Sequence, residues 1–197
     1  MRRFVVVGQR ASASPDFSLL DLPATSGRLD VLLRCLRAAL LVSHGSRRDT
    51  VVYLVLLGGS GAPRSIRVEG AAVRFLRPDE RSLATMVQKV LAMPAAGAAF
   101  TEVRPGISLA DGGLDAVLAD ARETRRYMLE EGAPDLRAQA LDGDDIAVFV
   151  GDHLGFDEAT RARLSALGAT PIGVGPISVH ADDAIAIVCN ELDRRAR

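Results

Sequence analysis

The sequence contains little cysteine, histidine and lysine, and the first two scarcities already limit its chemistry. Only two cysteines are present, Cys35 and Cys189, and they lie too far apart for a disulfide framework or a zinc site. Both fall in apolar helical contexts, so we expect buried thiols in a reducing, cytoplasmic compartment. The three histidines, His44, His153 and His180, have no HxxxH or HExxH spacing, and we therefore expect no metal site.

Other common signatures are also missing. There is no GxGxxG after the first apolar run and no GxxxxGK[ST], so no nucleotide-phosphate cradle is predicted. The serines near histidines lack the nucleophile-elbow context of hydrolases. The apolar run at residues 4–7 is too short for a signal or membrane segment, and no other run approaches that length. We expect no membrane association.

Positive charge in this chain comes almost entirely from arginine. The 24 Lys and Arg residues balance 25 Asp and Glu, and Lys89 is the only lysine. Two arginine clusters stand out: Arg28, Arg34, Arg37, Arg47 and Arg48 in the first, and Arg74, Arg77 and Arg81 in the second. The planar guanidinium fork suits phosphate, so these clusters are compatible with an RNA surface. A high-GC genome that prefers arginine codons is the alternative explanation.

Alternating strand and helix patterns predict a single α/β domain over residues 1–197, with a mostly parallel sheet flanked by helices. The expected strands cover residues 4–7, 51–57, 66–68, 73–76, 127–129, 146–150 and 172–174. The expected helices cover residues 28–43, 78–91, 114–122, 157–167 and 183–194, the first capped by Thr25 or Ser26. A polar loop to Pro23, an Ala/Gly-rich link at 94–99 and a Pro-Gly turn at 105–106 separate these elements.

Residues 145–193 contain two apolar runs that each end at glycine. The first run, 146–150, breaks at Gly-Asp-His (151–153), and the second, 172–174, breaks at Gly-Pro (175–176). Ligands of α/β proteins bind outside the carboxyl ends of strands, so these two breaks predict a ligand site. Glycines there would permit close approach of a ligand to the backbone. Taken by their spacing alone, simple turns are the better explanation of the same glycines.

Five sequence blocks, in a fixed order, carry a family resemblance. They are GRLDVLLRC (27–35), SHGSRRDTVVYLVLLG (43–58), RPDERSLA (77–84), FVGDHLG (149–155) and GPISVHADDAIAIVCNELD (175–193). With insertions and deletions mainly around residues 95–102, the chain resembles the archaeal tRNA pseudouridine N1-methyltransferase family and its bacterial relatives. The resemblance implies a SPOUT-type fold with a C-terminal trefoil knot, S-adenosylmethionine bound in that knot, and a homodimer.

The matching motif positions imply the cofactor contacts. They are Leu129, Gly151, Ile172, Gly173, Val174, Gly175, Pro176, Ile177 and Ala184. Main-chain groups of the loop 172–177 would hold the adenine, and Gly151 would let the cofactor lie close to its strand end. The resemblance also implies tRNA as the partner. Four arginines within the blocks are candidates for orienting the base or contacting RNA phosphate, namely Arg28, Arg47, Arg48 and Arg81.

The implied reaction is methyl transfer to N1 of pseudouridine, at position 54 of the tRNA T-loop in the family. The sulfonium methyl is already activated, so alignment with N1 can supply much of the rate. The N1 proton must leave, and a carboxylate or a water-linked base would help. Our candidates are Asp30, Asp49 and Asp79. Each also has a structural explanation, because Asp30 could pair with Arg34, Asp49 could turn its loop and Asp79 could cap a helix.

The chain departs from the family pattern beside the expected cofactor site. Archaeal members tend to have Asn-His-Cys where this chain has Asp182-Asp183-Ala184, and serines where it has Gly173 and Gly175. Added acidic charge is unfavourable next to RNA. Free pseudouridine or a related nucleoside is therefore the alternative acceptor, and a non-catalytic relative that binds RNA or cofactor is a further alternative.

Overall fold

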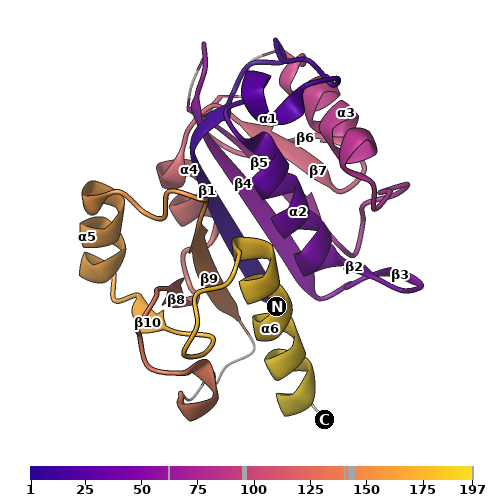
Figure 1. Ribbon diagram of the computed structural model, residues 1–197. Coiled ribbons are helices and arrows are strands. Elements are labelled where there is room, and N and C mark those ends of the chain that lie inside the picture. The colour runs from indigo at the N-terminus through magenta and orange to yellow at the C-terminus, as the bar shows by residue number, and fades with distance from the viewer. Residues whose placement is uncertain (62, 95–96, 140, 142–144, 197) are drawn as a thin grey trace.

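The computed structural model describes residues 1–61, 63–94, 97–139, 141 and 145–196, and within them one large sheet has the strand order β10-β8-β9-β1-β4-β5-β7-β6 (Figure 1). Its strands are β1 (Arg2–Ser12), β4 (Thr50–Gly58), β5 (Arg64–Glu69), β6 (Thr101–Arg104), β7 (Ile107–Ala110), β8 (Arg125–Leu129), β9 (Ile146–Gly151) and β10 (Thr170–Ile172). The pairs from β10 across to β4 are parallel, and the pairs from β4 to β6 are antiparallel. The predicted α/β class with a mostly parallel sheet is confirmed.

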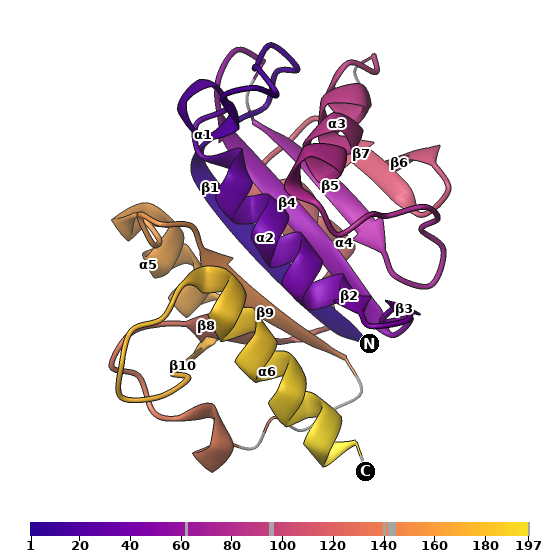
Figure 2. The ribbon, with the colours of Figure 1, turned by 45° about the vertical axis from the view of Figure 1, so that its right-hand side comes forward.

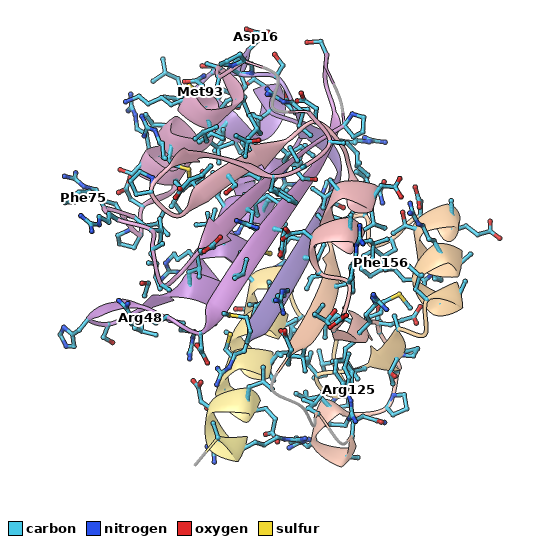
Figure 3. The ribbon with its side chains drawn as sticks, turned by 180° about the vertical axis from the view of Figure 1, so that it is seen from behind. Asp16, Arg48, Phe75, Met93, Arg125 and Phe156 are labelled. Carbon is cyan, nitrogen blue, oxygen red and sulfur yellow. The ribbon has the colours of Figure 1, made fainter. Side chains whose placement is uncertain are left out.

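Helices cover both faces of the sheet. They are α1 (Leu22–Thr25), α2 (Leu29–Leu40), α3 (Glu80–Leu91), α4 (Leu114–Asp120), α5 (Glu158–Ala166) and α6 (Ala181–Arg195), with a short 3-10 helix η1 (Leu136–Ala138) and a small hairpin of β2 (Leu41–Val42) and β3 (Gly45–Ser46). Helices α2, α3 and α6 lie on one face, and α2 and α6 run side by side (Figure 2). Helices α4 and α5 lie on the other face (Figure 3).

The central strand β1 shows why both faces are covered. Phe4 and Val6 are buried in the core under α2 and α6, whereas Val5 and Val7 are buried in the core under α4 and α5. Successive side chains of a strand point to opposite faces, so a continuous apolar run needs helices on both sides. The same strand pairs with β4 on one side and β9 on the other, which brings the two halves of the chain together.

Several predicted boundaries need correction. The strand predicted at residues 73–76 is wrong, because Phe75 has a left-handed φ of 59° and both edges of β5 are already paired, with β4 and β7. The segment predicted as a polar loop up to Pro23 instead contains the end of β1 and the first two residues of α1. The strand predicted at 172–174 ends at Ile172, and the helix predicted at 28–43 ends at Leu40, where the hairpin begins.

The Pro-Gly turn at 105–106 was predicted, but the two strands it joins, β6 and β7, were not. Each is only four residues long, so neither offers enough alternation to be recognised. A Cβ at Gly106, which has a φ of +71°, would come within 2.2 Å of the Val73 nitrogen. Residues 95–96 of the predicted Ala/Gly-rich link lie outside the described residues.

Candidate functional site

A cavity of about 740 Å³ opens where three parallel strands end. The last residues of β8, β9 and β10 line it, together with the loop at 173–179 and the first turn of α6. This is the edge of the sheet where α/β folds bind ligands. The two glycine breaks in residues 145–193 therefore meet at one place, as the sequence predicted.

The nine residues predicted to contact the cofactor all line this cavity. They are Leu129, Gly151, Ile172, Gly173, Val174, Gly175, Pro176, Ile177 and Ala184. They come from three strand ends, one loop and one helix, so their coincidence depends on the tertiary fold.

Glycine is required at two positions of the cavity wall. A Cβ at Gly173 would lie 2.4 Å from the Ala133 carbonyl oxygen, and one at Gly151 would lie 2.5 Å from the Gly155 carbonyl carbon. Gly173 also donates its N–H to the Pro134 carbonyl oxygen at 2.8 Å, and its own carbonyl oxygen accepts from the Leu136 N–H at 2.8 Å. Simple turn formation does not account for such close backbone contacts.

Acidic side chains surround the cavity and were not singled out from the sequence. Glu130, Glu131, Asp135 and Asp152 line it, and Glu130 forms an ion pair with Arg161 of α5. Arg161 also lines the cavity and Asp135 pairs with Arg137 at 2.6 Å, so the unbalanced negative charge comes from Glu131 and Asp152, and it favours a ligand that carries positive charge. The sequence signal that could have identified Asp152 is its place directly after the β9 glycine.

Asp152, directly after β9, bonds to the neighbouring strand β1. Its buried carboxylate accepts the Gln9 N–H of β1 at 2.9 Å and the Leu154 N–H at 2.8 Å. Bonds from main-chain N–H groups to a carboxylate are charge-assisted and strong. The carboxylate therefore fixes the cavity edge relative to β1.

A second cluster lies at the start of α2. Gly27 and Arg28 both have left-handed backbones, with φ of 63° and 69°, and a Cβ at Gly27 would lie 1.8 Å from the Arg10 carbonyl oxygen. A left-handed arginine costs about 1 kcal/mol or more, and such strain is common at functional sites. The predicted N-cap at Thr25 or Ser26 is wrong, because the N-cap of α2 is Arg28, which makes no side-chain cap bond. The Ser26 hydroxyl oxygen accepts the Leu29 N–H at 3.1 Å, and Thr25 bonds to the Asp21 carbonyl oxygen.

Two arginines hold the buried carboxylate of Asp30. Arg28 donates from Nε and Nη2 to its two oxygens at 2.9 and 3.0 Å, and Arg34 donates from Nη1 at 3.0 Å. Burial raises the pKa of Asp30, but the hydrogen bonds from Arg28 and Arg34 outweigh burial, so the pKa lies below its ordinary value. The predicted Asp30–Arg34 pair is confirmed. A carboxylate with a lowered pKa is a weak base.

Asp30→Asn is expected to lower the free energy of unfolding by about 1–3 kcal/mol at pH 7, the usual range for hydrogen bonds to charged groups. The folded pKa lies below the unfolded value near 3.8, so this stabilisation is present above that value and is lost as pH falls through the folded pKa. Urea titrations of both proteins at pH 7 and near pH 3 measure the difference. Asp21→Asn, at an exposed position, is the control, and an equal gap at both pH values would contradict the prediction.

The Arg28–Asp30–Arg34 cluster is connected to the cavity. Arg34 Nε lies 3.9 Å from Asp182 Oδ2, in the first turn of α6, and Ala184 in the same turn lines the cavity. Arg34 Nη1 also lies 3.8 Å from Glu80 at the start of α3. The acid that departs from the family pattern at position 182 is thus partly offset by an arginine.

The remaining predicted residues lie elsewhere in the chain. Asp49 and Arg47 are at the opposite end of the parallel strands, where Asp49 pairs with Arg2 at 3.1 Å and Arg47 pairs with Asp193 of α6 at 2.6 Å. Arg48, next to them, is exposed.

The structure does not bring Asp79 to the cavity either. Asp79 caps α3 as predicted and accepts the Ser82 N–H at 2.8 Å, a bond that lowers its pKa. Arg81, in the first turn of α3, is exposed. Of the residues predicted to act in catalysis, Asp30 and Arg28 are therefore the two that connect to the cavity, through the contacts of Arg34 with Asp30 and Asp182.

Two further findings concern metal-binding groups and membrane-spanning helices. In the described ranges, no group of three or more His, Cys, Asp and Glu side chains is arranged to hold a metal ion. None of the helices in the same ranges combines the length and the apolar character needed to cross a bilayer.

The chain is similar to known proteins along its whole length. Residues 1–196 match a family model described as "Putative SAM-dependent RNA methyltransferase". The tRNA (pseudouridine(54)-N(1))-methyltransferase of Methanosarcina mazei is 42% identical over 194 residues, which cover 98% of this chain and 92% of that protein. The protein of the same name from Methanocella arvoryzae is 40% identical over 197 residues, which cover 99% of this chain and 100% of that protein.

A solved structure shares the fold. Archaeoglobus fulgidus Nep1 bound to S-adenosylhomocysteine aligns with a TM-score of 0.73 at 19% identity, and the alignment covers 100% of this chain and 99% of that one. On the family match over residues 1–196 and the full-length relatives, the chain belongs to the family of SAM-dependent RNA methyltransferases.

Proposed function

We propose that this chain transfers a methyl group from S-adenosylmethionine to N1 of pseudouridine at position 54 of tRNA. The observation that carries the proposal is the cavity at the ends of β8, β9 and β10, which is lined by all nine expected cofactor residues. The relatives that are about 40% identical over the full length carry this activity in their names.

The cavity suits this cofactor in shape and charge. Gly151 and Gly173 leave room beside the backbone, so main-chain groups of the loop 172–177 can hold an adenine. Glu131 and Asp152 line the same space, and their negative charge favours the positive charge of a sulfonium. The bound cofactor would supply an activated methyl group, and the chain's own residues would orient the acceptor.

In this proposal Arg28 orients the pseudouridine base, and Asp30 positions Arg28. The bidentate bond from Asp30 fixes the guanidinium in one plane, and the left-handed backbone at Arg28 sets its direction. The candidate bases Asp30, Asp49 and Asp79 each make the structural bonds described above. The proposal therefore assigns acceptance of the N1 proton to water. It assigns contact with RNA phosphate, away from the cavity, to Arg47, Arg48 and Arg81.

We also propose the trefoil knot and a single SPOUT-type domain over residues 1–197. The chain after β10 runs against residues 133–136, where Gly173 exchanges hydrogen bonds with Pro134 and Leu136. Arg195, at the end of α6, then donates to the carbonyl oxygens of Leu136, Arg137 and Gln139. The connection from β8 to β9 is thus contacted by the chain before α6 and again by the end of α6. This arrangement supports threading of the last helix through that connection.

A homodimer is part of the proposal. Ile177 and Val179 line the cavity and are 75% and 42% exposed, and Leu154 beside it is 50% exposed. Clustered exposed apolar side chains often mark an interface, and a second copy of the chain would cover them. Light scattering of the purified protein tests the assembly. Both cysteines are free and buried, which fits the proposed reducing cytoplasm.

Incubation with S-adenosylmethionine and a T-arm RNA that contains pseudouridine at position 54 is expected to give one methyl group per RNA. The same RNA with uridine at that position is the matched control and should remain unmodified. Free pseudouridine should not react at a comparable rate. Transfer to the free nucleoside alone would favour the alternative acceptor, and calorimetric cofactor binding without any transfer would indicate a non-catalytic relative.

A further inference from the structure

Phe75 is an exposed aromatic residue held in an unfavourable backbone conformation. Its side chain is 98% exposed, and its φ is 59°. A left-handed backbone is costly for a bulky residue. A phenyl ring that stays in water also contributes no free energy of burial to the fold. Figure 3 shows Phe75 projecting from the side of the molecule that also carries Arg48. Neither feature contributes to the fold, which points to a role in binding.

The surroundings of Phe75 are basic. Arg74 and Arg77 flank it and are exposed, and Arg48 and His44 are exposed on the neighbouring hairpin segment. The ring and the hairpin border the same shallow cavity of about 360 Å³, which is lined partly by Val42, Val73 and Leu76. The acids around this surface have partners: Asp79 caps α3, Glu80 lies 3.8 Å from Arg34, and Asp49 pairs with Arg2. Glu69 pairs with Arg67, and Glu102 accepts the Gly106 N–H.

This composition fits RNA better than a protein partner. A stable protein interface needs about 800 Å² on each side with an apolar core, but Phe75 and Val42 are the large apolar side chains exposed on the described part of this surface. Aromatic rings set among arginines form the usual platform on which unpaired bases stack while the arginines neutralise phosphates. The charge of the flanking side chains is complementary to a nucleic-acid backbone.

The surface continues toward the proposed acceptor site. The loop that carries Phe75 leads directly into α3, whose first residue Glu80 lies beside Arg34, and Arg34 bonds to Asp30. We infer that Phe75 stacks on an unpaired base of the RNA substrate while Arg74 and Arg77 contact its phosphates. The inference rests on the proposed function in taking tRNA as the acceptor.

Phe75→Ala is expected to weaken binding of the T-arm RNA by about 5- to 100-fold, the range for loss of one stacked base. Phe75→Tyr, which keeps an aromatic face, should bind within about two-fold of the wild type. Fluorescence anisotropy of labelled RNA measures the RNA affinity of both variants. Calorimetry measures their cofactor affinity, which should equal that of the wild type. Because the ring is 98% exposed, thermal unfolding should also be unchanged.

The arginines provide an independent test. Arg74→Ala and Arg77→Ala should each reduce the slope of log affinity against log salt by about one, whereas Arg125→Ala, at an exposed position at the start of β8, should not. Unchanged RNA affinity in Phe75→Ala would overturn the inference, and so would a loss of dimer mass in light scattering, which would identify a protein interface instead. Phe75-dependent RNA binding without any methyl transfer by the wild type would contradict the proposed function alone.

Discussion

Gly173→Ala is expected to reduce the affinity for S-adenosylmethionine by at least about ten-fold and to lower the free energy of unfolding by about 1–3 kcal/mol. The added methyl group would lie 2.4 Å from the Ala133 carbonyl oxygen, well inside contact distance, and that oxygen belongs to the backbone. To make room, residue 173 must separate from residues 133–136, which loses the hydrogen bonds with Pro134 and Leu136. The loop that borders the cavity would move with it.

Calorimetric titration with the cofactor measures the affinity, and urea denaturation measures the stability. Gly112→Ala is the matched control, because a Cβ there meets only the Ala116 side chain at 3.2 Å and the residue is remote from the cavity lining. The control should bind the cofactor like the wild type. Normal cofactor affinity in Gly173→Ala would show that this wall does not hold the cofactor.

Arg28→Ala is expected to lower kcat/KM for RNA methylation by about 100-fold, the size of effect that loss of an orienting bidentate group produces. Cofactor affinity should change by less than about two-fold, because Arg28 does not line the cavity. Arg28→Lys should not restore activity, since an ammonium cannot reproduce the two parallel bonds to Asp30 that fix the guanidinium plane.

Initial rates at saturating cofactor and varied RNA give the comparison. Arg37→Ala removes an exposed arginine from the same helix and is the control for general loss of positive charge. Equal losses in Arg28→Ala and Arg37→Ala would attribute the effect to electrostatic attraction of RNA. Unchanged methylation in Arg28→Ala would mean that the acceptor site has been misplaced.

Much of the fold could be predicted because its central strands are long and apolar. β4, β9 and the core of β1 were identified correctly, and each is buried on both faces of the sheet. The short strands β6 and β7 were missed because their pairing depends on the edge of β5, which no local pattern reveals. The false strand at 73–76 shows the converse, since apolar residues without an open sheet edge remained a loop.

The position of the cavity could be predicted from the sequence, whereas the acceptor site stays a prediction, for a physical reason. The cavity is built from strand ends and glycines, which leave a local signal at Gly151 and Gly173. An arginine or aspartate leaves no such signal, because the same residue type serves in ion pairs and caps. Only the structure separates Asp30, held between two guanidiniums, from Asp49, which lies at the far end of the strands.

The central position of β1 has a consequence for the order of folding. Strand β1, the first in this sequence, pairs with β4, about 50 residues later, and with β9, about 145 residues later. Contacts between distant parts of a chain form slowly because long loops must close first. A compact unit of β1, α2, β4 and β5 can therefore form on the ribosome while one edge of β1 stays unpaired. Binding competence arises only in the last step, when the C-terminal quarter of the chain docks against that edge.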